Sequence, residues 1–380
     1  MKITVVLGAF FPVPPVMGGA VEKAWWDLGQ QFASRDHQVT FISRRMPGLP
    51  RQEIANGIQH LRVSGFNSPR SLVWLKFLDL LYSLNAKASL PNADIIVTNT
   101  FWLPILLGNP KRGQIYVHVG RYPKGQMRLY NRAARLQAPS TAIAEAIRRE
   151  APQFKGRVSV IPYPVPKPLD TSLPPLNARP KNILFVGRVH PEKGVHLLIE
   201  AFVKRMRTVF AEWRLMIVGP TETNLGGGGA DYRDKLKAAA VAAGDRIVFT
   251  GAVFDRHALD QLFADTRIFV YPSLARHGES FGLAPLEAMA HGCAVLVSKL
   301  DCFTDFIRDG ETGFIFNHDA LEPSEALSEQ LAKMVSEPDR VASLADKGFR
   351  VACEYSVEQV GDRFLADFDS ILQHAERANR

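Results

Sequence analysis

The chain has 380 residues, with 46 Lys and Arg against 38 Asp and Glu and a formal net charge of +8. Apolar residues make up 46% and charged residues 22%, which excludes a chain that is disordered over most of its length. One hydrophobic core rarely serves so many residues, so we expect two domains. The positive charge favours anionic partners, and no zinc-finger, RNP or helix-turn-helix signature supports a nucleic acid among them.

The cysteines and the first residues favour a cytoplasmic protein. The chain has three cysteines and no CxxC pair, which is typical of reduced thiols. Residues 2–7 run directly into a predicted strand and do not form a signal peptide. The most apolar stretch, residues 72–84, contains Lys76 and Asp79 and is too short to span a bilayer, so we expect a soluble or peripheral protein.

Short apolar runs alternate with helical patterns in the first part of the chain, which predicts a parallel sheet with crossover helices. The strands are predicted at residues 3–8, 38–43, 59–63, 94–98, 114–119 and 157–161. The helices are predicted at residues 19–33, 71–86 and 141–150. These elements form an expected N-terminal domain over residues 1–165.

A proline-rich segment interrupts the alternation. Residues 162–180 contain seven prolines, which cannot continue a helix or a central strand. We therefore predict an interdomain linker at residues 166–180.

The same alternation restarts after the linker and predicts a second domain over residues 181–356. Its strands are predicted at residues 182–186, 214–218, 246–250, 268–271 and 294–298, and its helices at 195–207, 232–243 and 283–291. Residues 357–380 are predicted to be a C-terminal helix that packs back toward the N-terminal domain, because four apolar residues can share one face of it. Those residues are Phe364, Phe368, Ile371 and Leu372.

Two carboxylates, Glu279 and Glu287, stand with seven residues between them. Pro285 fits only a first helical turn, so the helix is expected to begin near Gly282. Glu279 then precedes the helix and Glu287 lies one turn inside it, with free backbone N–H groups between them that suit a diphosphate. A nucleotide sugar has hydroxyls on both sides of a diphosphate and fits this arrangement. A capping glutamate and a solvated glutamate would explain the same residues.

Two cations are expected beside this helix. Arg188 and Lys193 lie in the loop after a strand that ends at Gly187, and Gly219 ends the next strand. Open α/β sheets bind ligands at the carboxyl ends of their strands, where two cations can neutralise a leaving diphosphate. As isolated residues they would be solvated loop charges.

Three weaker signals lie elsewhere in the chain. Gly18 and Gly19 open a predicted helix and would let the backbone approach a ligand, although a tight turn would need glycine as well. His118 ends an apolar strand, where a histidine either faces a cleft or is a structural residue whose ring nitrogens are hydrogen-bonded within the fold. Residues 226–229 are all glycine, and we interpret them as a flexible loop because no Walker motif follows.

Taken together, these motifs resemble a known family. The chain has a Gly-Gly loop, a strand-terminal His, Gly-Arg-x4-Lys-Gly, and Glu-x7-Glu with Phe-Gly-Leu inside it, in that order. This pattern is similar to the retaining GT-B glycosyltransferases of family 4, most specifically over residues 182–313. The resemblance implies an α/β fold of two Rossmann-like domains whose parallel sheets face each other across a cleft.

The resemblance also implies roles for single residues. Glu279 would bond the sugar hydroxyls, Glu287 the ribose, and the backbone near Val253 the base. The residues implied in catalysis are Glu279, His118, Arg188 and Lys193. The residues implied in donor binding are Gly18, Gly19, Gly187, Arg188, Lys193, Gly219, Val253, Glu279, Phe281, Gly282, Leu283 and Glu287.

The chain departs from the family pattern in two places. Tyr163-Pro164 stands where the family often has Asn-Gly, which affects the hinge. Residues 300–305 replace a frequent Gly-Gly pair with its following Glu, so the identity of the donor sugar is not carried over.

The expected reaction is transfer of a hexose or related sugar from a UDP- or GDP-sugar, in cell-surface polysaccharide or glycolipid synthesis. Arg188, Lys193 and the helix N-terminus can stabilise the leaving diphosphate, so no metal and no cofactor are expected. The one Asp-x-Asp, at residues 367–369, lies in the terminal helix and is interpreted as a solvated face. The alternatives are a catalytically silent nucleotide-sugar-binding subunit and a phosphorylase or epimerase of the same architecture.

The resemblance implies that the N-terminal domain is on the acceptor side, and we expect the acceptor to be a glycan, a lipid-linked saccharide or a small molecule. Residues 121–149 are rich in basic side chains, and with the apolar residues 72–84 they could meet a lipid-linked or acidic glycan at the inner face of the membrane. The basic residues are Arg121, Lys124, Arg128, Arg132, Arg135, Arg148 and Arg149. A solvated face beside a core helix is the alternative, and both stay open.

Overall fold

The computed structural model describes residues 1–380 except 18, 68, 70, 109–111, 166–173 and 379–380. The chain divides into two compact units. Unit 1 comprises residues 1–167 and 355–380, and unit 2 comprises residues 168–354. Residues 166–173, the first eight of the predicted linker at 166–180, lie outside the described residues.

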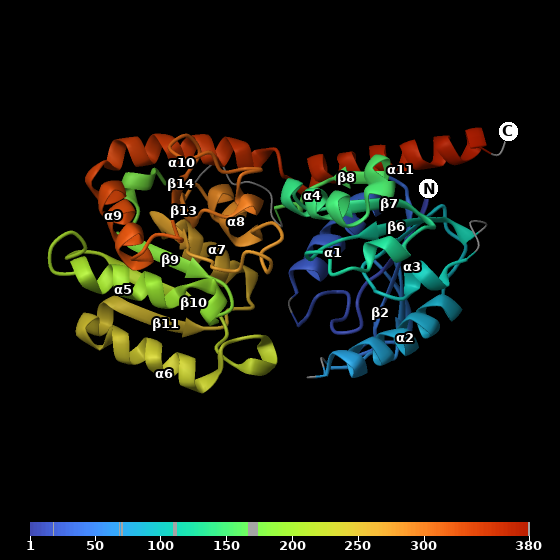
Figure 1. Cartoon of the computed structure of the whole chain (residues 1–380), viewed down its shortest axis with the longest axis horizontal. Helices are drawn as coiled ribbons and strands as arrows, with labels where there is room; N and C mark the ends of the chain where they lie inside the picture. Colours follow the sequence, from blue (N-terminus) through green and yellow to red (C-terminus); the bar gives the residue numbers. More distant parts are fainter. Residues whose placement is uncertain (18, 68, 70, 109–111, 166–173, 379–380) are drawn as a thin grey trace. The chain divides into compact units, whose positions relative to one another are not determined.

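Unit 1 is built on an eight-stranded sheet, counted over its described residues, in the order β3-β4-β2-β1-β5-β6-β7-β8. Every neighbouring pair is parallel except β3 with β4. The strands are β1 (Lys2–Val6), β2 (Gln38–Arg44), β3 (Gln52–Ala55), β4 (Ile58–Val63), β5 (Ile95–Thr98), β6 (Gln114–His118), β7 (Ala133–Ala138) and β8 (Val158–Val160). The helices are α1 (Ala20–Ala33), α2 (Leu72–Ala88), α3 (Leu103–Leu106), α4 (Thr141–Glu150) and α11 (Val357–Ala378) (Figure 1).

The terminal helix α11 is part of the core of unit 1. The ring of Phe364 lies 5.0 Å from that of Trp25 on α1, and the ring of Phe368 lies 4.9 Å from that of Tyr116 on β6. Arg135 on β7 pairs with Asp367 at 2.7 Å. The interpretation of Asp367 as a solvated residue is therefore wrong, since the packing of the apolar face of α11 on the sheet places Asp367 beside Arg135.

Unit 2 contains a six-stranded sheet, again counted over the described residues, in the order β11-β10-β9-β12-β13-β14 with every pair parallel. The strands are β9 (Asn182–Val186), β10 (Arg214–Val218), β11 (Ile247–Gly251), β12 (Ile268–Tyr271), β13 (Ala294–Ser298) and β14 (Phe314–Phe316). The helices are α5 (Val195–Arg205), α6 (Gly229–Ala240), α7 (Arg256–Ala264), α8 (Leu283–Ala290), α9 (Pro323–Ser336) and α10 (Pro338–Cys353).

Strand order fixes where a ligand can bind in each unit. In unit 2 the chain moves outward from β9 to β10 and β11, then returns to β12 on the other side of β9. In unit 1 the same reversal places β1 between β2 and β5. Loops leave such switch points in opposite directions and open a crevice at the carboxyl ends of the strands. The predicted motifs follow β9 and β1.

Candidate active site

A buried ion pair lies at the switch point of unit 2. The Nζ atom of Lys193, just after β9, is 2.6 Å from Oε2 of Glu279, which follows β12. The hydroxyl of Ser273 donates to the same oxygen at 3.1 Å, and Ser298 Oγ donates to the Ser273 carbonyl at 2.5 Å. Burial alone would lower the pKa of Lys193, but Tyr271 and the Glu279 carboxylate outweigh it and raise that pKa above its usual value.

The backbone around this pair requires glycine. Gly194 has a φ of 66°, and a Cβ there would lie 2.0 Å from the carbonyl oxygen of Pro272. Gly219 ends β10, and a Cβ on it would lie 1.8 Å from the carbonyl oxygen of Gly187. The loops after β9 and β10 are thus pressed together. This close approach keeps Lys193 and the β9 loop at the strand ends.

Arg188 lies in the same loop but is more exposed. Its guanidinium donates to the carbonyl of Gly226 at 2.9 Å and to Glu192 at 2.8 Å. Gly226 adopts a left-handed φ of 82°, and α6 begins at Gly229. The glycine run thus forms an ordered turn that supports a cation, a role that the sequence pattern alone did not indicate.

Helix α8 begins as its sequence predicts. Its N-cap Gly282 has a φ of 95°, and a Cβ there would lie 2.4 Å from the ring of Phe303. Phe281 is buried and packs on Phe306, with 5.3 Å between ring centroids. Leu283 opens the helix, so the first N–H groups of α8 lie four residues after Glu279 in the chain. These groups can bind an anion beside Lys193.

Glu287 lies inside α8 and is 8% exposed, so it is not a solvated surface residue. Its Oε1 accepts from Nη1 of Arg256 at 3.0 Å, and Nε of Arg256 lies 2.9 Å from Asp260. Burial lowers the pKa of Arg256, but Glu287 and Asp260 raise it further than burial lowers it. Arg256 was not predicted. Its one sequence signal is the Arg-x3-Asp spacing at the start of α7.

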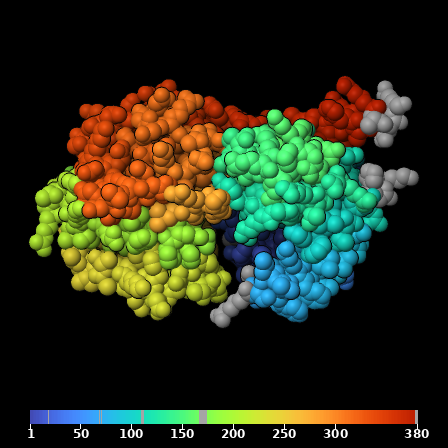
Figure 2. Space-filling view, in the orientation of Figure 1, coloured from blue at the N-terminus to red at the C-terminus, as the bar shows by residue number. Residues whose placement is uncertain are grey.

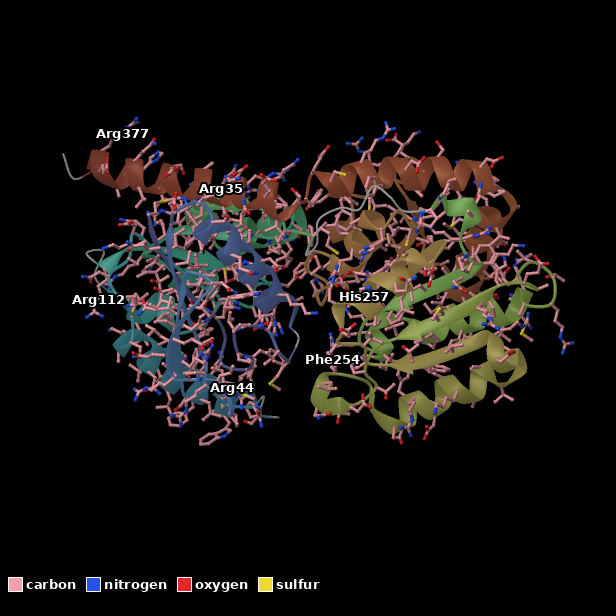
Figure 3. All side chains as sticks on the ribbon, turned by 180° about the vertical axis from the view of Figure 1, so that it is seen from behind. Arg35, Arg44, Arg112, Phe254, His257 and Arg377 are labelled. Carbon is pink, nitrogen blue, oxygen red and sulfur yellow. The ribbon has the colours of Figure 1, made fainter. Side chains whose placement is uncertain are left out.

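The loop before α7 carries Val253 and Phe254. Val253 is half-buried, whereas Phe254 is 60% exposed. Phe254 and His257, labelled in Figure 3, flank Arg256 closely in sequence. An exposed aromatic ring at the end of β11 is available to a planar ligand group.

His118 ends β6 in unit 1 and is 3% exposed. Gln137 donates through Nε2 to the Ile161 carbonyl, so its Oε1 accepts from Nδ1 of His118 at 2.5 Å. The proton on Nδ1 leaves Nε2 as an acceptor, to which the Tyr163 hydroxyl donates at 2.8 Å. Burial lowers the pKa of His118 to about 4, so the ring is neutral at physiological pH.

The Gly-Gly loop is described only in part, because Gly18 lies outside the described residues. Gly19 has a φ of 93°, and a Cβ there would lie 2.2 Å from Oε2 of Glu22. Glu22 is buried, and burial raises its pKa although its backbone hydrogen bond and Arg121 lower it. The carboxylate of Glu22 therefore lies over the N-terminus of α1, a contact that the glycine pattern did not predict.

The predicted residues fall into two groups, each within its own unit. In unit 1, His118 ends β6 and Gly19 is the N-cap of α1. The members in unit 2 gather at its strand ends: Gly187, Arg188, Lys193, Gly219, Val253, Glu279, Phe281, Gly282, Leu283 and Glu287. Among the described residues, no group of three His, Cys, Asp or Glu is placed to hold a metal ion.

Comparisons with known proteins agree with this arrangement. The family described as "Glycosyl transferases group 1" matches residues 172–351, and "Glycosyltransferase Family 4" matches residues 17–167. The lipopolysaccharide core biosynthesis mannosyltransferase LpcC of Rhizobium leguminosarum is 31% identical over 189 residues, which cover 49% of this chain and 50% of the relative. A phosphatidyl-myo-inositol mannosyltransferase of Mycobacterium tuberculosis is 25% identical over 332 residues, 83% of this chain and 82% of the relative.

Solved structures agree at the level of the fold. A glycosyltransferase from Rickettsia africae has a TM-score of 0.75 at 18% identity, covering 98% of this chain and 99% of that one. Anabaena HepE in complex with UDP and glucose has a TM-score of 0.71 at 19% identity, covering 97% and 100%. The two Rossmann-like units define the GT-B class of fold. The chain belongs to the group 1 and family 4 glycosyltransferases. It spans about half the length of the first curated relatives that it matches.

Proposed function

We propose that the protein is a retaining glycosyltransferase that moves a hexose or related sugar from a UDP- or GDP-sugar to a glycan, a lipid-linked saccharide or a small molecule. One observation carries the proposal. A buried cation, Lys193, and a largely buried carboxylate, Glu279, meet at the switch point of a parallel sheet. The similarity to a lipopolysaccharide core biosynthesis mannosyltransferase and to a phosphatidyl-myo-inositol mannosyltransferase favours a cell-surface glycan or glycolipid as the product.

Departure of a nucleoside diphosphate creates negative charge, which must be stabilised as it develops. Lys193 supplies a fixed charge, and the N-terminus of α8 supplies N–H groups. Arg188 is 44% exposed at its side chain, so its guanidinium can turn from Glu192 onto a phosphate. Three positive groups in one loop cluster support transfer without a divalent metal.

Retention belongs to the proposal through the family, and the state of the Glu279 carboxylate bears on the route it would take. Its Oε2 already accepts from Lys193 and from Ser273. A carboxylate held by two donors is a weak nucleophile and a good partner for sugar hydroxyls. Same-face attack would then break the bond from the anomeric carbon to the diphosphate oxygen and form the bond to the acceptor oxygen. The leaving phosphate would take the acceptor proton.

Thermal shift with a panel of UDP- and GDP-sugars tests the proposal, followed by product analysis. A ligand at one hundred times its Kd stabilises by about 2.7 kcal/mol, which corresponds to a rise in Tm of roughly 5–10 °C. We expect one nucleotide class to give this rise and to be hydrolysed slowly, with the α-configured sugar retained. Binding without any turnover, with a range of acceptors present, would favour the silent subunit. Turnover that requires inorganic phosphate would favour a phosphorylase.

We also propose that the protein works in the cytoplasm. All three cysteines are free, and Cys293 and Cys302 are buried. Buried thiols that form no disulfide fit a reducing compartment. In the part of the chain that the structure describes, no helix has the length and apolar character needed to cross a membrane. Fractionation of the cells that make the protein tests the location.

A further inference from the structure

Helix α2 exposes its apolar side chains. Val73, Phe77, Leu81 and Leu84 are 80%, 46%, 43% and 44% exposed, and their spacing places them on one stripe along the helix. Leu72 and Trp74, beside the stripe, are 66% and 53% exposed. The interpretation of this segment as a core helix is therefore wrong. In Figure 2 the light-blue surface, which includes α2, lies open on the face that the view shows.

The opposite side of α2 is fixed to unit 1. Tyr82 is buried and donates from its hydroxyl to the Leu7 carbonyl at 2.8 Å. Asp79 accepts the backbone N–H groups of Phe101 and Trp102 at 3.2 and 3.3 Å. These contacts fix the rotation of the helix about its axis. The apolar stripe therefore faces outward because of the fold of unit 1, and a small rotation cannot bury it.

The charge around the stripe is positive. Unit 1 contains 25 Lys and Arg against 13 Asp and Glu, whereas unit 2 contains 21 against 25. Lys76 and Lys87 lie along one edge of the stripe, and Asp79, the one acidic residue of α2, is turned inward to its backbone partners. An apolar stripe with a basic edge and no outward acidic group on the helix complements an anionic surface.

We infer that α2 binds in the interface of an anionic lipid bilayer, parallel to its plane. From Val73 to Leu84 the stripe extends about 17 Å along the helix, which suits a helix that lies on a membrane and not one that crosses it. Trp74 stacks on Phe77 with 5.2 Å between ring centroids, and tryptophan is favoured at the level of lipid headgroups. A second copy of the chain is disfavoured because two basic units would repel each other.

This inference goes beyond the proposed transferase activity and does not depend on it, since α2 belongs to unit 1 and the Lys193–Glu279 pair to unit 2. Vesicle binding and donor hydrolysis can therefore be measured separately. If hydrolysis fails while vesicle binding holds, only the proposed function is lost, and the reverse result removes only the membrane inference.

The test is co-sedimentation of the full chain with vesicles of phosphatidylethanolamine and phosphatidylglycerol, beside vesicles of phosphatidylcholine alone. We expect binding to the anionic vesicles that weakens as salt is raised. The variant Phe77→Ser/Leu81→Ser/Leu84→Ser should bind roughly tenfold or more weakly, because it loses the inserted apolar area. The control Ile54→Ser/Val241→Ser/Leu321→Ser removes three exposed apolar residues that do not belong to α2 and should bind like wild type.

Tryptophan fluorescence gives a readout that needs no destabilising change. Phospholipids brominated on their acyl chains should quench wild-type emission, and Trp74→Phe should abolish most of this quenching. Equal sedimentation of the α2 variant and wild type, or equal quenching in wild type and Trp74→Phe, would overturn the inference. A wild-type chain that does not bind the vesicles would also overturn it, whether that chain is monomeric or dimerised through α2. In the dimeric case, the partner that covers the apolar stripe would be a second copy of the chain.

Discussion

The Nζ atom of Lys193 and Oε2 of Glu279 lie 2.6 Å apart, with side chains that are only 6% and 11% exposed. A buried pair of opposite charges is costly to form, because both ions lose their hydration. Its position at the switch point of the sheet means that an incoming diphosphate would meet a preformed cation. The same pair therefore links the stability of unit 2 to its chemistry.

Removing the cation alone should destabilise unit 2. Lys193→Met leaves the Glu279 carboxylate buried without its charge partner, and such changes cost about 3–5 kcal/mol. Urea unfolding of the variant measures the cost. Arg276→Met is the matched control, because Arg276 pairs with Asp319 at an exposed position where the cost is below about 1 kcal/mol. If Lys193→Met lowers the unfolding free energy no more than the control does, the pair is not effectively buried.

The contribution of Lys193 should not vary near neutral pH. Its pKa in the folded chain is raised, so its stabilisation is fully present below the unfolded-state pKa of about 10.4 and is lost only as pH rises through the folded value. The difference in unfolding free energy between wild type and Lys193→Met should therefore stay constant between about pH 7 and 9. A difference that shrinks by more than about 1 kcal/mol across that range would contradict the raised pKa.

His118 gives the opposite pH dependence. Its pKa falls to about 4 in the folded chain, against about 6.5 in the unfolded chain. The stabilisation is present above about pH 6.5 and is lost as pH falls toward 4, because only the unfolded chain takes up the proton in that window. The glutamine in His118→Gln has no titratable group. Relative to this variant, the unfolding free energy of wild type should fall by about 2 kcal/mol between pH 7.5 and 5. Parallel unfolding curves for the two proteins at both pH values would contradict the assignment.

Activity should persist without divalent metal. Lys193 and Arg188 supply positive charge at the strand ends where a metal would otherwise act. Donor hydrolysis or transfer in excess EDTA should remain within about twofold of the untreated rate, because fixed cations already stabilise the developing charge. Loss of nearly all activity that magnesium or manganese restores would refute this prediction.

The sequence predicts the parts of the molecule that depend on local rules. The strands over residues 182–186 and 214–218 match β9 and β10, since apolar runs that end in glycine are unambiguous. Strand β7 was missed because its residues, 133–138, include three alanines and Arg135 and show no β-branched run. The residues that make Arg135 acceptable in a strand lie on α11, far away in the chain.

The same limit applies to the site. Glycine spacing and helix-start rules placed Glu279 and Glu287 on either side of the first turn of α8. The Glu287 partner, Arg256, depends on how α7 packs against α8, and the donor to His118, Tyr163, depends on β6 meeting the segment after β8. Neither pairing has a local pattern. Tertiary packing alone brings these side chains together.

The last prediction separates the two carboxylates. Glu287 is expected to bond the ribose, which does not change during transfer, so Glu287→Gln should raise KM and leave kcat unchanged. A charge-assisted hydrogen bond of about 1.5–3 kcal/mol implies a rise of roughly ten- to more than a hundredfold. Arg256→Leu should also raise KM, because the Glu287 carboxylate then loses the 3.0 Å contact that positions it.

Glu279 should behave differently, since positive charge develops on the sugar ring as the phosphate leaves, and its anionic oxygen matters most at that moment. Glu279→Gln should therefore lower kcat. Calorimetry with the free nucleoside diphosphate should detect a loss of affinity in Glu287→Gln and little change in Glu279→Gln. Glu311→Gln, at an exposed position, is the neutral control. If Glu279→Gln alters KM alone, or if neither variant changes donor handling, the roles assigned to these two carboxylates are wrong.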